Sequence, residues 1–159
     1  MTATARLVIE RVRVRLRVDS DPDLSHLGEY SRTLKPGGID RAERGDAGPR
    51  ELRYFNPGAG DPDYIERDYA RAERYNRGDW CMVGVYAEAE IVVNGRTQRV
   101  TSAGLWGIES DSGRDYFREV GREETAQLCA DLAAMGFGKR AIRRAVAEMR
   151  ERGDDDGSE

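Results

Sequence analysis

The chain has 159 residues, of which 35% are charged and 38% are hydrophobic, and its formal net charge is −4. The hydrophobic share is large enough for a folded core and excludes global disorder, while the balanced charge gives no argument from composition alone for a nucleic-acid-binding protein or an acidic decoy. The length predicts one domain over residues 1–152, followed by a disordered acidic tail at 153–159.

The cysteines and the start of the chain bear on the compartment. Cys81 and Cys129 fall in a strand-like and a helix-like pattern, and a reducing environment would keep both as small buried apolar residues. Neither a signal peptide nor a membrane-spanning run is recognisable. The sequence therefore predicts a cytoplasmic protein that does not contact a membrane.

The first predicted strand runs from Arg6 to Val18 and alternates between two kinds of side chain. Apolar residues occupy its even positions from Val12 onward, and arginines occupy the odd ones. This arginine face has two interpretations: it tracks phosphates or an acidic partner, or it is a solvated sheet face whose arginines pair with glutamates on neighbouring strands. The four arginines are Arg11, Arg13, Arg15 and Arg17.

The region after that strand is rich in glycine and proline. Leu27–Leu34 fits a short strand, and Lys35–Arg50 is predicted to be a long loop because glycine and proline recur there among charged residues. Loops of this length are uncommon unless they are functional or disordered. We therefore regard the loop as a candidate contact surface.

A helix is predicted after a second short strand at Glu51–Phe55. Asp61 is expected to cap the helix, Pro62 to occupy its first position, and the segment Asn76–Gly78 to end it. We expect this helix to cover the apolar beginning of the central strand that follows.

The strongest structural signal in the sequence is a β-hairpin. From Trp80 to Val93 every odd position is apolar, which is typical of a strand with one buried face. The pair Asn94-Gly95 tolerates the two positive φ angles of a type I′ turn. A two-residue loop sets the register, so Glu90 should lie opposite Arg99 as a cross-strand pair of opposite charge.

Glycines flank the second tryptophan in Gly104–Ile108, which indicates a bulge or a close backbone approach. The acidic turn that follows has three interpretations. It could hold a hard cation such as calcium, although its spacing does not match an EF-hand loop. Glu109 and Asp111 could form an acid–base pair. Ser112 could instead cap the next helix, with Asp115 completing a capping box.

Two helices complete the predicted fold. Arg122–Met135 and a segment from Gly138 to about Arg152 carry apolar residues at helical spacing, whereas Tyr116–Val120 fits either a helix or a strand. A short turn makes the two helices packed neighbours. The order of the elements predicts an α+β fold, with an antiparallel sheet, a long central β-hairpin and about three helices packed on one face.

Four stretches resemble one protein family: residues 27–31 (LGEYS), 54–57 (YFNP), 75–80 (YNRGDW) and 104–112 (GLWGIESDS). Through them, the chain from about Asp19 to Phe137 resembles an uncharacterised family of small proteins that we associate with bacteriophages, plasmids and integrated elements. The resemblance implies an accessory gene of a mobile element. Small proteins in that setting often block a host machine, such as a defence system, or act on nucleic acid. The resemblance implies no catalytic residue.

The sequence lacks P-loop, dinucleotide-binding, zinc and nucleophile-elbow motifs, which lowers the expectation of an enzyme. No catalytic residue, metal or cofactor is predicted. The preferred hypothesis is a non-enzymatic interaction protein that binds a host or phage protein. The alternatives are a nucleic-acid-binding accessory protein that uses the arginine face, and a small enzyme with a carboxylate site. The hairpin could also pair two copies in a homodimer. The predicted binding residues are Arg11, Arg13, Arg15, Arg17, Trp80, Trp106, Glu109 and Asp111.

Overall fold

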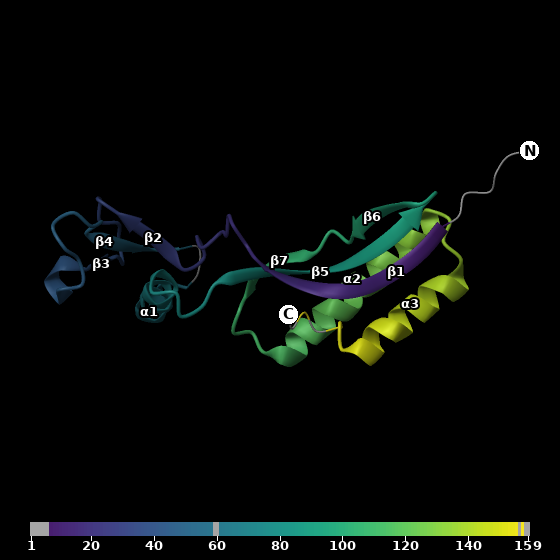
Figure 1. Cartoon of the computed structure of the whole chain (residues 1–159). Coiled ribbons are helices and arrows are strands. Elements are labelled where there is room, and N and C mark those ends of the chain that lie inside the picture. The colour runs from purple at the N-terminus through teal and green to yellow at the C-terminus, as the bar shows by residue number, and fades with distance from the viewer. Residues whose placement is uncertain (1–6, 59–60, 156, 158–159) are drawn as a thin grey trace, which may run out of the picture. The chain divides into compact units, whose positions relative to one another are not determined.

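The computed structural model describes residues 7–58, 61–155 and 157. The predicted α+β fold is confirmed, with antiparallel sheets and three α-helices among these residues (Figure 1). The chain divides into two compact units, whereas the sequence predicted one domain over residues 1–152. We call Met1–Asp19 together with Met82–Glu159 the terminal unit, and Ser20–Cys81 the inserted unit.

The terminal unit contains a four-stranded antiparallel sheet. β1 (Leu7–Val18) pairs with one edge of the central strand β5 (Met82–Val93), and β6 (Arg96–Thr101) and β7 (Leu105–Glu109) share the other edge. Two helices, α2 (Arg114–Ala134) and α3 (Lys139–Arg152), pack against β5 and β1 (Figure 1). We call the sheet face opposite these helices the outer face.

The core of the terminal unit lies between β5 and its two helices. The hairpin has the predicted register, with Glu90 opposite Arg99. Asn94 and Gly95 both take the positive φ angles of the predicted turn, 51° and 80°. The period-two pattern and the turn pair were therefore sufficient to predict this element. Five of the six odd positions of β5 are buried as predicted, and Val93 beside the turn is half-buried. The buried five are Val83, Val85, Ala87, Ala89 and Ile91.

The inserted unit contains a three-stranded antiparallel sheet in the order β2 (Gly28–Ser31), β4 (Tyr54–Pro57), β3 (Ile39–Asp40). α1 (Ile65–Asn76) packs against β2 and β4 around the fully buried Phe55. The small sheet supplies apolar surface to α1, and within the terminal unit α2 packs against β5. The expected cover of the central strand by α1 concerns two different units and stays a prediction.

Three local predictions are corrected. The predicted loop Lys35–Arg50 contains β3 and a short 3-10 turn at Ala42–Arg44. The helix predicted at Arg122–Met135 begins earlier, at Arg114. It includes Tyr116–Val120, which fitted either a helix or a strand in the sequence. Gly113 is the N-cap residue, without a side-chain capping bond, so the capping box predicted at Ser112 was wrong. The Ser112 amide instead donates to the Glu109 carbonyl at 3.0 Å and closes the turn after β7.

The segment after α3 runs along the free edge of β1. Gly153 ends the helix with a φ angle of 74°, and the Asp154 carbonyl accepts a hydrogen bond of 2.7 Å from the Val14 amide. The Asp154 carboxylate accepts from Arg11 Nε at 3.1 Å and from Arg11 Nη2 at 3.0 Å. We predicted a disordered tail from residue 153, and for Asp154 this was wrong because the edge strand supplies its partners. Residues 156, 158 and 159 of that tail lie outside the described residues.

These contacts make stability depend on pH. The hydrogen bonds from Arg11, and then from Arg152, hold the pKa of Asp154 below its ordinary value. A carboxyl group whose pKa is lowered by folding stabilises the folded state above its unfolded pKa, and this contribution is lost as pH falls through the folded pKa.

Asp154→Asn should therefore flatten the acid branch of the stability curve. Below about pH 4, the ordinary range of an aspartate pKa, the wild-type free energy of unfolding should fall more steeply than that of the variant. Urea denaturation at a series of pH values measures both slopes. Parallel slopes would show that Asp154 titrates equally in the folded and unfolded states.

Candidate functional site

The outer face of the terminal unit gathers most of the predicted binding residues. Odd residues of β1 stand beside even residues of β5, so Arg13 pairs with Glu88, Arg15 with Tyr86, and Arg17 with Gly84 in the strand register. β7 adds Trp106, and β6 adds Arg99 opposite Glu90. The face therefore has a charged half toward the hairpin turn and an aromatic half toward Gly84.

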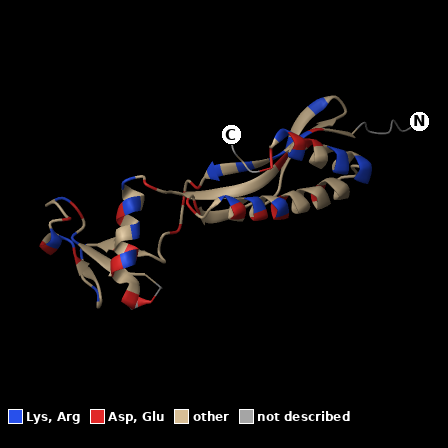
Figure 2. Cartoon of the chain, turned by 90° about the horizontal axis from the view of Figure 1, so that it is seen from below, with Lys and Arg blue, Asp and Glu red and all other residues tan. Residues whose placement is uncertain are grey.

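The charged half is held by ion pairs within the sheet. Arg13 donates to Glu88 at 2.6 and 2.8 Å and to Glu90 at 3.1 Å, and Arg99 lies 3.8 Å from Glu90. The side chains of Arg13 and Glu88 are 13% and 8% exposed. Two of the four predicted arginines thus serve the fold, since Arg11 binds Asp154 and Arg13 binds the glutamates. The face is not a continuous basic stripe, and Figure 2 shows acidic and basic residues mixed over the chain.

The aromatic half is a stacked pair on the sheet surface. Tyr86 and Trp106 have ring centroids 6.3 Å apart and planes 18° apart, and Trp106 is 44% exposed. The indole lies flat over Gly84, where a Cβ atom would lie 2.5 Å from Cδ2 and 2.6 Å from Cζ3 of the ring. Gly104, with a φ angle of 80°, turns the chain into β7 so that the ring can reach this position. Gly84 on β5 and Gly104 before β7 together allow the flat position of the ring.

Arginines border this aromatic pair on β1. Arg15 stands opposite Tyr86, and the exposed Arg17 stands opposite Gly84 beneath the indole. We call Arg15, Arg17, Tyr86 and Trp106 the Trp106 patch. Tyrosine, tryptophan and arginine combine large contact area with charge-assisted or stacking contacts, and they dominate the binding energy of interfaces.

The other predicted tryptophan is not on a surface. Trp80 is 3% exposed, its Nε1 donates to the Arg71 carbonyl at 3.0 Å, and the Arg71 guanidinium stacks 3.8 Å from its ring centroid. Tyr75 packs edge-on at 5.2 Å. We predicted Trp80 as a binding residue, and the structure buries its ring against α1, where it presents almost no surface to a partner.

The acidic turn borders a pocket of about 410 Å³. Asp111 lines this pocket, and neither Glu109 nor Asp115 does. Within residues 7–58, 61–155 and 157, no group of three histidine, cysteine or acidic residues is placed to hold a metal ion. General acid–base catalysis requires both carboxyl groups to reach one cleft, and this pocket does not bring Glu109 and Asp111 together.

A polar cluster in the inserted unit was missed by the sequence analysis. Arg41 is buried and donates to the Leu52 carbonyl at 2.7 Å, to the Tyr69 hydroxyl at 3.2 Å and to Glu73 at 3.3 Å. Its guanidinium also stacks on Tyr30, 4.8 Å from the ring centroid. We call Tyr30, Arg41, Tyr69 and Glu73 the Arg41 cluster. Arg41 thereby ties the segment between β3 and β4 to Tyr69 and Glu73 of α1. Tyr30, Arg41 and Glu73 also line an open pocket of about 550 Å³.

Within this cluster the tyrosines stay protonated. Burial, followed by the hydrogen bond of 2.6 Å that Tyr30 donates to Glu73, raises the pKa of Tyr30 well above its ordinary value. Burial also raises the pKa of Tyr69. Both hydroxyls therefore act as hydrogen-bond donors at neutral pH, as a satisfied buried network requires.

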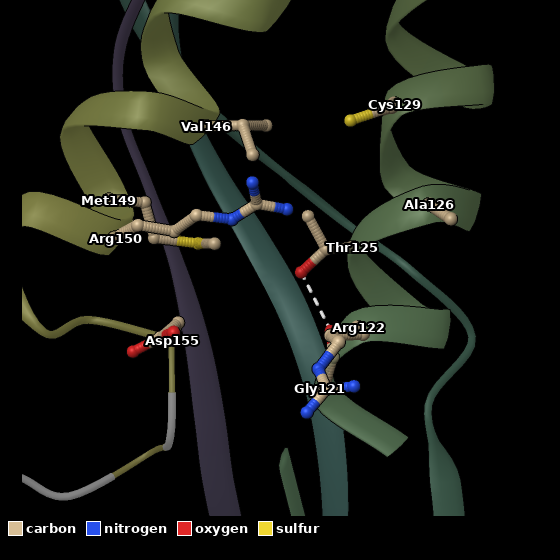
Figure 3. Close-up of a pocket in the computed structure, with 9 residues that line it drawn as sticks. All are labelled: Gly121, Arg122, Thr125, Ala126, Cys129, Val146, Met149, Arg150 and Asp155. Atoms are coloured by element: carbon tan, nitrogen blue, oxygen red, sulfur yellow. Dashed lines mark hydrogen bonds between the residues drawn. The ribbon is translucent and has the colours of Figure 1, made fainter. Parts of the chain in front are cut away.

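A second missed feature is a pocket of about 270 Å³ between α2 and α3 (Figure 3). Arg122 of α2 and Arg150 of α3 line it together with apolar side chains, and Asp155 of the turn after α3 completes the wall. The sequence carried one signal for it: Val146, Met149 and Arg150 share a helical face at spacings of three and four residues. That signal alone does not show which residues of α2 face this side of α3.

No protein-family model, curated protein or solved structure matches the chain. The resemblance to mobile-element proteins therefore stays a prediction from the four motifs. No helix in the described part of the chain combines the length and apolar character needed to cross a membrane.

Proposed function

We propose that this chain is a non-enzymatic interaction protein that binds a partner protein through the Trp106 patch. The observation that carries this proposal is the stacked Tyr86–Trp106 pair, which stays exposed on the sheet although its rings could contribute to a core. Exposed aromatic anchors with a polar rim are the arrangement that concentrates binding energy at protein interfaces.

The charges around the patch favour a protein partner. Arg15 and Arg17 border the rings, while Arg13 and Glu88 form an ion pair on the next residues of the same face. This distribution fits an apolar surface flanked by a few carboxylates better than a continuous line of phosphates. We infer that the partner inserts an apolar group against Trp106 and places acidic groups near Arg17.

The setting of the interaction follows from the motifs. The resemblance of residues 104–112 and 75–80 to proteins of mobile elements supports a host or phage protein as the partner, including a component of a host defence system, in the bacterial cytoplasm. In the first motif, Trp106 belongs to the Trp106 patch and Gly104 lies beside its ring. In the second motif, Trp80 is hydrogen-bonded to α1 inside the inserted unit.

Trp106→Ala should abolish capture of the partner. Tagged wild-type protein, incubated with nuclease-treated bacterial lysate, should retain a stoichiometric partner identified by mass spectrometry. The variant should bind that purified partner at least roughly 30-fold more weakly, the effect of losing one aromatic anchor. Met135→Ala is the matched control, because Met135, the C-cap residue of α2, is 46% exposed against 44% for Trp106. Equal binding by both variants would remove the patch from the interface.

Single-stranded nucleic acid is a second candidate, favoured by one observation: a flat, exposed indole beside the exposed Arg17 is also a platform on which a base can stack. This alternative predicts that a labelled oligothymidine binds with an affinity that falls steeply with salt. Arg17→Gln should lower the salt slope by about one. Absence of binding at low salt would leave the protein partner as the proposal.

A further inference from the structure

Two arginines, Arg122 and Arg150, line the pocket between α2 and α3. Within the described residues, neither Arg122 nor Arg150 makes an ion pair or a hydrogen bond to another side chain. In Figure 3 the Arg150 side chain extends from α3 toward Thr125 of α2. By contrast, Arg13 donates hydrogen bonds to a carboxylate, and Arg41 donates to a backbone carbonyl. An unpaired guanidinium at a concavity offers planar donors that match a carboxylate or a phosphate.

The rest of the lining sets the shape and polarity of a ligand. Ala126, Val146 and Met149 give apolar walls. The Thr125 hydroxyl donates to the Gly121 carbonyl at 2.7 Å, so its proton is used within α2. Asp155 adds a negative charge at another side of the pocket. This carboxylate disfavours a ligand with a second anionic group at that end, so a single anionic head joined to an apolar body fits best.

The pocket belongs to one rigidly connected part of the fold. Its walls come from α2, α3 and the turn that Asp154 ties to Val14 and Arg11 of β1. A Cβ atom at Gly121 would lie 3.2 Å from the Asp155 carbonyl oxygen and 3.2 Å from Cγ1 of Val14, so the turn after α3 closes against α2 at this glycine. The ordered turn therefore keeps the pocket formed without a ligand.

We propose that this pocket binds a small organic anion. Its carboxylate or phosphate head contacts Arg122 and Arg150, and its short apolar body contacts Val146 and Met149. The volume of about 270 Å³ lies just below the usual range of ligand pockets, roughly 300–1,000 Å³, which favours a small ligand. The site is separate from the Trp106 patch and does not depend on the function proposed for that patch.

Three probes test the class of ligand: phenyl phosphate, inorganic phosphate and phenol, titrated while backbone amide resonances are followed by NMR. Phenyl phosphate should saturate with shifts centred on Thr125, Cys129 and Val146. Inorganic phosphate lacks the apolar body and phenol lacks the charge, so each should bind at least roughly tenfold more weakly. Inorganic phosphate binding as tightly as phenyl phosphate would overturn the organic part of the proposal.

Arg150→Gln tests the role of the guanidinium. It should weaken phenyl phosphate binding roughly tenfold to a hundredfold, the usual range for a hydrogen bond to a charged group. Arg143→Gln on the same helix is the matched control, because Arg143 is exposed and does not line the pocket. An amide spectrum that is unchanged elsewhere shows that each variant is folded. Equal weakening by the two variants, or shifts scattered over many arginine-bearing surfaces, would overturn the site.

Discussion

Arg41→Ala should lower the free energy of unfolding of the inserted unit by about 3–5 kcal/mol, the usual cost of breaking a buried charged network by removing one partner. The Arg41 side chain is 8% exposed. Its removal takes one donor from the Leu52 carbonyl and one from the Glu73 carboxylate, which keeps the hydrogen bond from Tyr30. Because Arg41 itself is buried, its loss should cost more than the loss of a surface contact.

The two tryptophans allow this loss to be measured in the intact chain, because each unit carries one. Trp80 lies in the inserted unit and Trp106 in the terminal unit. In a Trp106→Phe background, the fluorescence of Trp80 reports urea unfolding of the inserted unit alone. A fluorescence midpoint for Arg41→Ala that falls well below the wild-type value would be the expected result.

Arg53→Ala is the matched control for Arg41→Ala. Arg53 also makes a two-pronged ion pair, with Asp40, at distances down to 2.6 Å, but its side chain is 54% exposed. Exposed pairs typically contribute up to about 1 kcal/mol. The two variants should therefore differ by several-fold in their effect on stability. Similar effects would mean that burial does not set the contribution of Arg41.

Gly84→Ala should displace the Trp106 indole from the sheet and lower stability by about 1–3 kcal/mol, the usual cost of overpacking. The added methyl group would lie 2.5 Å from Cδ2 of the ring, far inside van der Waals contact. The ring cannot keep both its position over β5 and its stacking on Tyr86. The variant should therefore also lose binding at the Trp106 patch, although residue 84 presents no side chain to a partner.

A double-mutant cycle identifies the cause of that loss. In a Trp106→Ala background the methyl group meets no ring, so Gly84→Ala should cost much less, with a coupling energy of about 1 kcal/mol or more. Chemical denaturation followed by circular dichroism suits all four proteins, because it does not depend on tryptophan. Gly104→Ala is not an equivalent test, since its φ angle of 80° adds backbone strain. If the two substitutions had additive effects on the free energy of unfolding, the cost of Gly84→Ala would come from the strand and not from a clash with the ring.

Local chemistry was enough to predict several elements. The hairpin depends on residues close in sequence: a period-two pattern and the pair Asn94-Gly95 specify strands, turn and register together. α1 and α3 likewise end at or near the residues predicted from helix periodicity and glycine terminators. These signals act over a few residues, so an amino-acid sequence displays them directly.

Candidate binding residues were predicted less well. A strand pattern shows which side chains share a face, but it does not show which residues of other elements lie beside them. Alternation placed Arg11, Arg13, Arg15 and Arg17 together without showing which of them would meet carboxylates. Arg13 proved to be paired with Glu88, and Arg11 with Asp154, which is 143 positions away in the chain. Both tryptophans were predicted as binding residues, yet Trp80 is buried and Trp106 is exposed.

By itself, the sequence determined the α+β class, the central hairpin and the amphipathic helices, because each depends on contacts between residues near one another in the chain. The tertiary structure alone decided the division into two units, the burial of Arg41, the pocket at Arg150 and the exposed position of Trp106. The physical reason is that burial and ion pairing depend on which distant segments pack together. That choice reflects the summed packing of whole elements, which no local pattern contains.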